Sequence, residues 1–435
     1  MIHFDPALDL FPLVAAMLAA VSCALLGNFL VLRRISLMGD AISHSVLPGL
    51  VVAFLISATR DPVVMFVGAA CAGLLTIVLV ELVKRLGRVE PGAAMGVVFS
   101  LFFALGVLLI ERAAVSHIDL DADCVLYGQL ETLVWFDAPA STHEFFSIGT
   151  LAAAPRQVVT LTITCLLTAF FVVLLFKELR IASFNAQLAT TLGFNASLLH
   201  YALMTLVAIA AVASFEAVGS ILVIAMLICP AAGARLMTDR LVPQVVWSVI
   251  FALASSTFGY FGATAVPAIF DADSVNAAGS ITVASGVFLA CAIFFAPAHG
   301  VLAKSLRRGA VADRVALENL LAAIYRAGKE SDASAPIERV RDQFANAAFT
   351  RALAIARRRD LVWIDGETLV LTEHGLEAAE AIVRRHRLWE SYLVDRAGLA
   401  PDHVHEPAEQ LEHVRVSPES GPPVDPHGKP IPRRQ

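Results

Sequence analysis

Nine apolar runs, each close to the length that crosses a membrane, follow one another along the first part of this chain. The hydrocarbon core of a bilayer is about 30 Å thick, and about 20 helical residues span it. Because lipid offers the backbone no hydrogen-bond partner, such runs must be helical. They predict an all-α polytopic membrane protein, with spans at residues 10–32, 37–58, 62–83, 92–110, 158–176, 198–215, 218–237, 245–266 and 281–296.

The composition agrees with this prediction, because 57% of the 435 residues are hydrophobic and only 16% are charged, unlike an ordinary soluble domain. Lys and Arg gather in every second connection between the runs, and such connections face the cytoplasm. We therefore expect the N-terminus outside and the region after residue 296 inside. Runs 198–215 and 218–237 are so close that a broken hairpin also fits, which leaves eight or ten spans open. The basic connections contain Arg33, Arg34, Lys84, Arg85, Arg88, Lys177, Arg180, Arg235, Arg240, Lys304, Arg307 and Arg308.

The region after residue 296 is rich in charge and predicts a separate body in water. Leu317, Leu320 and Leu321 recur at helical spacing. Alternating residues around Asp365 and Gly366 predict a β-hairpin, and helices followed by a hairpin suggest a small α/β winged helix. We divide the chain into a membrane domain at 1–300, a linker at 301–314, a winged-helix-like domain at 315–372, a helical domain at 373–416 and a Pro-rich tail at 417–435.

The second predicted span contains two ionisable residues. Its strictly apolar part is too short to cross a bilayer, so the helix must include Asp40 and His44. Four residues apart, they share one helix face, and a carboxylate with an imidazole suits manganese, iron or zinc. Ionisable groups inside a membrane are costly and usually line a transport path. The alternative is that Asp40 caps the helix and His44 satisfies a neighbouring backbone group.

The connection after the fifth run contains an amphipathic segment. Phe184, Leu188 and Leu192 fall on one side of a short helix, and Gly193 is its stop. A helix at the cytoplasmic face is suited to docking a partner protein, although it could also rest on lipid headgroups. The chain has no GxxxxGK[ST] run, so we do not expect it to be an ATPase itself.

Four segments in a fixed order carry a resemblance to a known family. RRISLMGDAISHSVLPGL at residues 33–50 resembles the signature of the manganese, zinc and iron-chelate ABC permeases. DADCVLYG at 121–128, FNAQLATTLGFNASLLHYALM at 184–204 and EAVGSILVIAMLICPAAGARLM at 216–237 agree with it. The resemblance covers residues 11–296.

This resemblance implies a permease subunit of an ATP-driven importer of divalent transition metal, with no enzymatic activity of its own and no organic cofactor. It implies that Asp40 and His44 handle the ion and that a cytosolic ABC ATPase docks on residues 184–193. It also implies an extracytoplasmic metal-binding protein and a second permease copy or paralogue, in a bacterial plasma membrane. Residues 185–187 are Asn-Ala-Gln where relatives more often carry Asp-Pro-Glu, which leaves the choice of ATPase open.

A second resemblance lies in the charged tail. RRHRLWESYLVDRAGLAPDHVHEPAEQLEHV at 384–414 and DPHGKPIP at 425–432 are similar to the metal-sensing region of diphtheria-toxin-repressor-like regulators of iron and manganese. This implies a metal-sensor-like domain that binds Mn²⁺, Fe²⁺ or Zn²⁺. The implied ligands form one group of His386, Glu390 and His405 and another of Glu409, Glu412 and His413.

The second ligand group also follows from helix spacing. Glu409, Glu412 and His413 share one face at i, i+3 and i+4, and their oxygen and nitrogen atoms suit hard and borderline ions. For any one of them the alternative is a solvated helix face. Glu409 stands where iron sensors tend to place Cys, which favours manganese. The family's two acidic positions in the first tail helix fall on Asn319 and Ala322.

Two other function classes compete with a metal ABC permease. A membrane-tethered transcriptional regulator would bind DNA through its tail, but residues 345–359 match a recognition helix poorly, and their three terminal arginines are a weak phosphate-binding patch. DNA binding is therefore not expected. An ion-coupled secondary carrier would need acidic relays in several spans, and beyond Asp40 and Glu81 the predicted spans offer few. The leading hypothesis is a permease for manganese, then iron or zinc, with a metal-responsive tail.

Overall fold

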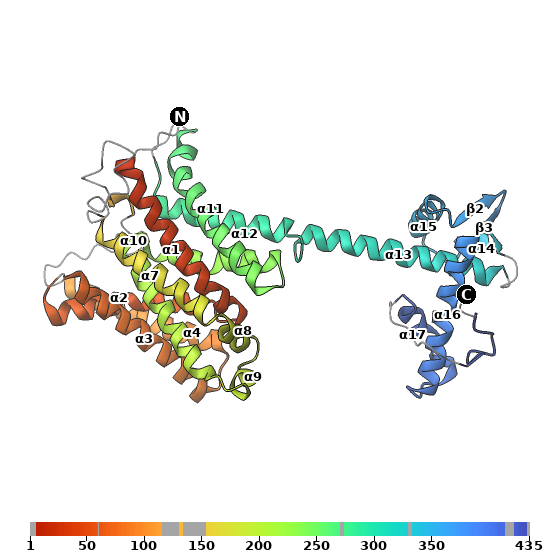
Figure 1. Cartoon of the computed structure of the whole chain (residues 1–435), viewed down its shortest axis with the longest axis horizontal. Coiled ribbons are helices and arrows are strands. Elements are labelled where there is room, and N and C mark those ends of the chain that lie inside the picture. The colour runs from red at the N-terminus through yellow and green to blue at the C-terminus, as the bar shows by residue number, and fades with distance from the viewer. Residues whose placement is uncertain are drawn as a thin grey trace. The chain divides into compact units, whose positions relative to one another are not determined.

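The chain forms two compact units, Met1–Ala303 and Lys304–Gln435. The first is a bundle of long helices, and the second is a small α/β body with a hydrophobic core of its own (Figure 1). Among the residues that the structure describes, eight helices, all in the first unit, are long and apolar enough to cross a membrane. Each of the predicted runs falls on one of them. The computed structural model describes residues 6–59, 61–114, 130–133, 154–269, 274–328, 333–413 and 422–432.

Polar caps fix where several membrane helices begin. Asp61 accepts a hydrogen bond from the Val63 amide at 2.7 Å at the start of α3 (Pro62–Gly87), and Asn276 accepts one from the Gly279 amide at 2.9 Å at the start of α12 (Ala277–Phe295). These bonds satisfy N–H groups that the first helical turn leaves unpaired.

The motif at 121–128 lies outside the described residues. The unit's other elements are α1 (Pro6–Leu32), α2 (Met38–Ser57), α4 (Pro91–Ala114), η1 (Leu130–Thr132), α7 (Arg156–Leu174), α8 (Phe176–Phe184), α9 (Ala186–Thr191), α10 (Ala196–Met237) and α11 (Leu241–Ala268).

The first half of α10 runs along α1 in the opposite direction. Near its start, His200 Nδ1 lies 3.3 Å from Nη1 of Arg33, just after the end of α1. Further along, Ser214 Oγ lies 3.9 Å from Sγ of Cys23, in the middle of α1. The first half of α10 therefore extends from the end of α1 toward its start.

The chain turns back at Gly219. This residue has φ 77° and ψ 167° inside α10, a backbone conformation that is open almost only to glycine. Beyond the turn the Leu227 carbonyl packs against Gly27, closer to the end of α1 than Cys23 is. The predicted runs 198–215 and 218–237 are therefore the two arms of a hairpin broken at this glycine.

Small residues and buried polar side chains hold the membrane helices together. Gly49 of α2 and Gly68 of α3 each pack against the other's carbonyl, which is possible because small residues let membrane helices approach closely. Asn28 donates to Ser248 Oγ at 2.6 Å, and Gln244 donates to the Asn28 side-chain oxygen at 3.1 Å. All three are fully buried, so these bonds join α1 to α11 inside the bundle.

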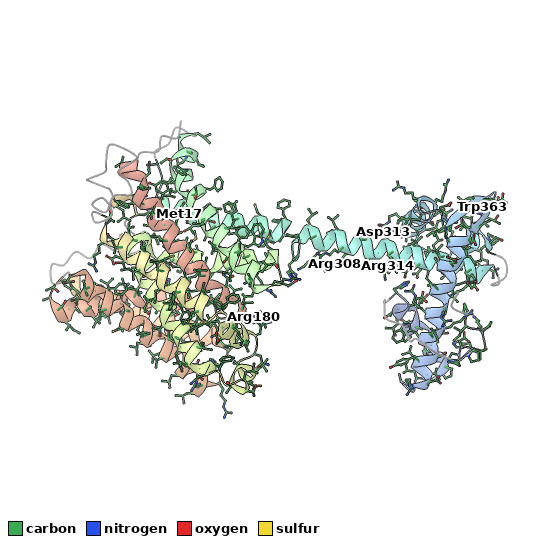
Figure 2. All side chains as sticks on the ribbon, in the orientation of Figure 1. Met17, Arg180, Arg308, Asp313, Arg314 and Trp363 are labelled. Atoms are coloured by element: carbon green, nitrogen blue, oxygen red, sulfur yellow. The ribbon has the colours of Figure 1, made fainter. Side chains whose placement is uncertain are left out.

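The second unit has the predicted winged-helix-like arrangement followed by further helices. Its sheet has the order β1-β3-β2 with antiparallel neighbours. The hairpin between β2 and β3 turns at Gly366, whose φ is 55°, with Asp365 paired to Thr368. Trp363 projects from β2 and is exposed (Figure 2). The elements are α13 (Val301–Ala327), β1 (Ser334–Pro336), α14 (Ile337–Arg341), α15 (Asn346–Arg358), β2 (Val362–Asp365), β3 (Thr368–Leu371), α16 (Glu373–Asp395), η3 (Pro401–His403) and α17 (His405–Leu411).

One core connects the sheet to the surrounding helices. It takes Leu320 from α13, Ala352 from α15, Leu369 from β3 and Ala379 from α16, all fully buried. Helix α13 begins at Val301, so the predicted linker is helical as well. Its first part carries charged side chains, whereas its second part supplies the core; Figure 2 labels Arg308, Asp313 and Arg314 on this helix.

Candidate metal centres

Asp40 and His44 lie one turn apart at the start of α2. His44 Nε2 is 3.4 Å from Asp40 Oδ1, and the side chains of His44 and Asp40 are 23% and 33% exposed, respectively. Because α2 begins at Met38, Asp40 falls in the first turn, where a carboxylate also interacts favourably with the helix dipole. The pair thus sits in a spanning helix and remains accessible on the surface of a single chain.

Aromatic rings of α4 flank this pair. The Phe99 and Phe103 rings meet the His44 ring edge-on, with centroids 4.7 and 5.5 Å away. Asp40 and His44 can give a divalent ion one oxygen and one nitrogen. Transition metals take at least four ligands, so water or a second subunit would have to provide the rest.

The predicted docking segment consists of two short helices rather than one. Helix α8 ends at Phe184, and Asn185 is extended and caps α9 by accepting from the Leu188 amide at 3.0 Å. Asn favours such caps over helix interiors because its side chain competes for backbone groups. Phe184, Leu188 and Leu192 are 63%, 49% and 56% exposed. Gly193 follows with φ 89°.

A cavity of about 650 Å³ lies between these short helices and the start of α11. Phe184 and Leu188 line one side of it, and Leu241 and Pro243 line the other. The start of α11 follows directly after α10. The end of α10 therefore lies on the same side of the bundle as α8 and α9, as the hairpin requires.

Arg33 links the short helices to the long ones. Its Nε donates to Ser183 Oγ on α8 at 3.1 Å, and its Nη1 lies 3.3 Å from His200 on α10. A single guanidinium thus joins the end of α1, the candidate docking helices and the first arm of the α10 hairpin.

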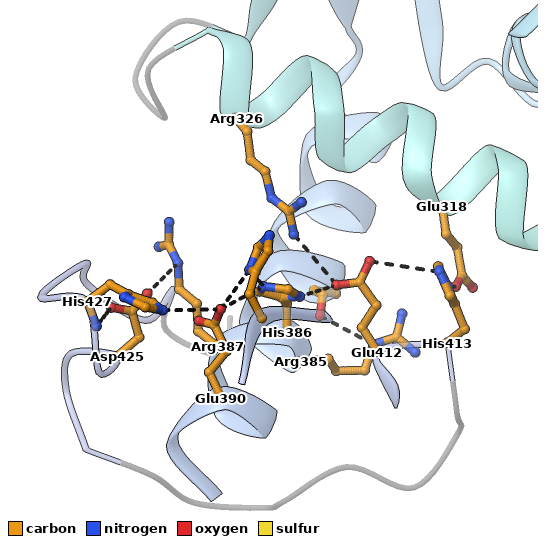
Figure 3. A network of polar contacts seen from close by, with 12 residues as sticks. Glu318, Arg326, Arg385, His386, Arg387, Glu390, Glu412, His413, Asp425 and His427 are labelled. Carbon is orange, nitrogen blue, oxygen red and sulfur yellow. Dashed lines mark hydrogen bonds and ion pairs between the residues drawn. The ribbon is translucent and has the colours of Figure 1, made fainter. Parts of the chain in front are cut away.

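Three tail residues bring metal-binding atoms to one point, and Figure 3 labels two of them, His386 and Glu390. His386 and Glu390 lie one turn apart on α16, and His405 begins α17. His386 Nε2 and His405 Nδ1 lie 3.0 and 2.9 Å from the same oxygen, Glu390 Oε1, and 3.1 Å from each other. These three residues form what we name the tail cluster.

The tail cluster fits a divalent ion. Its three ligand atoms lie within 4.8 Å of one another. In a tetrahedral site with bonds of about 2.1 Å, neighbouring ligand atoms are about 3.4 Å apart, so a small outward adjustment would admit an ion. Imidazole suits zinc and iron, whereas carboxylate also suits manganese.

Hydrogen bonds control the protonation of this cluster. Burial by itself would raise the pKa of Glu390, but the bonds from His386 and His405 outweigh it and lower that pKa to about 2. Burial by itself would lower the pKa of His386, but the bonds to Glu390 and Glu412 raise it above the usual value. The cluster therefore favours a charged carboxylate beside a protonated imidazole, and a cation that replaces the proton preserves this balance.

Glu412 faces the other nitrogen of His386. Its Oε2 lies 2.7 Å from His386 Nδ1, and the side chain is 1% exposed. Arg326 of α13 lies 3.6 Å from the same oxygen, and His413 Nε2 lies 3.9 Å from Glu412 Oε1. A carboxylate on the far nitrogen of a metal-binding histidine fixes its tautomer and orientation, which is the position that Glu412 occupies.

Sequence reasoning missed Glu318. Its Oε2 lies 2.7 Å from Nδ1 of His413. The resemblance had instead placed the family's two acidic ligand positions at Asn319 and Ala322, which are not acidic in this chain. The available signal was an acidic residue in the half of α13 that is otherwise mostly buried. Glu409, by contrast, is exposed on α17 and is not part of the tail cluster.

Each of the two units contains a segment that matches a known protein family. Residues 10–138 and 143–300 match the ABC 3 transport family. Residues 372–433 match the metal binding and dimerisation domain of iron dependent repressors. The second match begins just after β3, so it includes the tail cluster but not the winged-helix-like part.

Individual relatives agree. The chain is 39% identical over 295 residues to the manganese transport system membrane protein MntD of Bacillus subtilis, which covers 68% of this chain and 94% of the relative. It is 35% identical over 372 residues to the zinc transport system membrane protein TroD of Treponema pallidum, which covers 84% of this chain and 96% of the relative. The second alignment is longer than the membrane unit and so includes part of the tail.

A solved structure has the same fold. PsaBC from Streptococcus pneumoniae in complex with Fab superimposes with a TM-score of 0.53 at 29% identity, over 69% of this chain and 94% of that chain. The resemblance inferred from the sequence is thus confirmed, and an ion-coupled secondary carrier no longer competes. The chain is a member of the ABC 3 transport family, and its residues 372–433 are similar to the metal binding and dimerisation domain of iron dependent repressors.

Proposed function

We propose that this chain is the permease subunit of an ATP-driven importer of divalent transition metal, manganese first, then iron or zinc. The observation that carries the proposal is the Asp40–His44 pair, a carboxylate and an imidazole 3.4 Å apart in a spanning helix. The relatives' descriptions as manganese and zinc transport proteins support the same substrate class. We place the protein in a bacterial plasma membrane, with its N-terminus outside, its tail in the cytoplasm, and a second permease subunit beside it.

Replacing either member of this pair tests the transport path. Asp40→Asn and His44→Ala should each lower metal accumulation by about tenfold or more, because even outer-shell partners of bound metal typically contribute that much to affinity. Uptake is measured in cells that carry the complete transporter, with protein abundance followed in membranes. Glu90→Gln, a charge change at an exposed position outside α2, is the control. Normal uptake by both variants would exclude this pair from the path.

We further propose that a cytosolic ABC ATPase docks on Phe184, Leu188 and Leu192. These side chains are exposed, and the cavity beside Phe184 and Leu188 offers an apolar surface for a partner to cover. Leu188→Asp with Leu192→Asp should release the ATPase from the purified transporter. Thr190→Asp adds a charge to the same short helix away from this side and should leave the complex intact. A complex that survives the double substitution would exclude these leucines as docking residues.

We also propose that ion binding at the tail slows import. Three contacts connect the neighbourhood of the tail cluster to α13: Arg326 with Glu412, Glu318 with His413, and Arg314 with the His413 carbonyl. Helix α13 follows the last spanning helix in the chain, so a change in its position is a means of acting on transport. The effect is limited by the difference in ion affinity between the transporting and the inhibited conformations.

Removing residues 304–435 tests this regulation. Uptake by the truncated protein should continue at internal metal concentrations that slow the intact one. The double variant His386→Ala/His405→Ala should behave like the truncation, whereas Glu409→Gln should behave like the intact protein. Identical uptake curves for all four proteins would show that the tail does not regulate transport.

A further inference from the structure

The apolar face of α13 extends beyond the core of the tail. In the second half of this helix, Leu317, Leu320 and Ile324 share one face and are buried in that core. Leu302 and Leu306 lie on the same face near the start of the helix, because a helix turns by about 100° per residue. These two leucines are 51% and 66% exposed. The core of the tail therefore takes up this face only in the second half of the helix.

Positive charge lies on the other side of the first half. We call residues 301–312 the basic segment. Lys304, Arg307 and Arg308 are exposed in it and lie away from the two leucines around the helix axis; Figure 2 labels Arg308. The basic segment contains no acidic residue, and the first one on the helix is Asp313. An apolar side opposite a cationic side is the pattern of helices that lie in the headgroup region of a membrane.

The start of α13 is fixed at one end of the membrane bundle. The last spanning helix, α12, ends at Phe295, and residues 296–300, which follow it, can extend over at most about 20 Å. His299 holds this connection in place, because its amide donates to the Leu236 carbonyl at 3.1 Å and its Nε2 lies 2.7 Å from Asp239 Oδ1. Leu236 is in the last turn of α10, and Asp239 follows that helix. The basic segment therefore begins beside the ends of two helices that cross the membrane.

Charge distinguishes between the partners that could cover the two leucines. A second copy of this chain that packed through the same leucines would bring its three cations close to those of the first copy. Like charges separated by less than the Debye length, about 8 Å at physiological salt, repel each other. A surface of anionic lipid instead attracts a basic segment next to a span. It also accepts leucine side chains at the boundary between headgroups and acyl chains.

We propose that the basic segment binds a membrane surface that contains anionic lipid. Leu302 and Leu306 enter the boundary between headgroups and acyl chains, and Lys304, Arg307 and Arg308 contact lipid phosphates. This interaction makes the position of α13 depend on lipid composition. The inference needs only a chain that spans a membrane, and it is independent of the metal chemistry proposed above.

Hydrogen exchange of the full-length protein in nanodiscs tests this proposal. Discs of phosphatidylcholine alone are compared with discs of phosphatidylcholine and phosphatidylglycerol in equal parts. Both leaflets of a disc have the same composition, so the result does not depend on which face of the membrane carries the tail. Exchange of the amides of residues 304–312 should be at least about fivefold slower in the anionic discs, which is the effect of a single cation near an anionic surface. Salt at 1 M should remove the difference, because it shortens the screening length to about 3 Å.

A matched pair of variants separates this segment from the charge of the whole tail. Lys304→Gln/Arg307→Gln/Arg308→Gln should exchange equally fast in both kinds of disc. The control Arg357→Gln/Arg358→Gln/Arg359→Gln removes the same charge from exposed positions at the end of α15 and should keep the slow exchange in anionic discs. The buried amides of α16 report on folding and should exchange alike in all proteins.

Three results would overturn the proposal. Fast exchange of the basic segment in both kinds of disc would show that lipid does not cover it. Slow exchange in both would assign the two leucines to a protein partner, such as a second copy of the chain. Loss of the slow exchange in the control variant would show that the net charge of the tail, rather than the basic segment, determines the effect.

Discussion

Replacing Glu412 by Gln should weaken ion binding at the tail cluster although Glu412 is not one of the three residues that form this cluster. The substitution keeps the size of a side chain that is 1% exposed, so it leaves no cavity. It removes the charge 2.7 Å from His386 Nδ1. The imidazole then loses the ionised acceptor that fixes its tautomer and directs Nε2 toward the ion.

The magnitude follows from this geometry. Outer-shell partners of metal-bound histidines typically contribute about 10–100-fold in affinity, which is about 1.4–2.7 kcal/mol. A hydrogen bond to an ionised acceptor is about twice as strong as one between neutral groups, and water does not reach Glu412. We therefore expect the upper half of this range. Arg326 loses a counter-charge 3.6 Å away, but its side chain is 34% exposed and remains solvated.

Calorimetric titration of the full-length protein with zinc and with manganese measures this effect. The protein also carries Asp40→Ala and His44→Ala, which remove the pair in α2 as a second binding site. Glu409→Gln is the matched control because Glu409 lies on α17, whose C-cap is Glu412, but is exposed. The zinc and manganese affinities of Glu409→Gln should stay within about twofold of those of the parent protein. If Glu409→Gln weakens binding as much as Glu412→Gln, or Glu412→Gln has no effect, the outer-shell position of Glu412 is refuted and the helix-face assignment of Glu409 as a ligand is favoured.

Two further predictions concern the membrane unit. Gly27→Ala should destabilise the protein by about 1–3 kcal/mol, because a Cβ there would overlap the Leu227 carbonyl. In the same unfolding experiment Gly286→Ala, whose added Cβ meets open space, should be neutral or slightly stabilising. Equal stability of the two variants would refute the close packing of α1 and α10. Arg33→Ala should leave the ATPase bound and active but lower metal uptake per ATP hydrolysed, because Arg33 joins α8 to α10; an unchanged ratio would exclude this link from coupling.

The spans could be predicted from the sequence because a bilayer imposes length and apolarity on any helix that crosses it. The course of α10 was only partly predictable. Closeness of the runs at 198–215 and 218–237 allowed a broken hairpin, but its geometry depends on the backbone of Gly219 and on packing against Gly27. The first is a local backbone conformation and the second is a contact between residues far apart in the chain, and periodicity encodes neither.

The docking segment shows how a local rule competes with periodicity. Apolar spacing predicted one helix from Phe184 to Gly193, yet Asn185 ends α8 and caps α9. The capping bond to the Leu188 amide satisfies a donor that would otherwise be exposed at the new helix start. The apolar residues remain exposed after the break, so the pattern located the surface although it missed the interruption.

The tail cluster was predictable where its ligands share a helix and not where they come from distant segments. His386 and Glu390 are one turn apart on α16, so spacing indicates a common face. Glu318 depends on the rotation of α13 about its axis. A helix turns by about 100° per residue, so placing the acidic position at Asn319 instead of Glu318 directs the side chain toward a different neighbour. The buried leucines on either side of Glu318 fix that rotation by packing into the core, and the position of this carboxylate beside His413 is therefore a consequence of the hydrophobic face of α13 rather than of any metal-ligand motif.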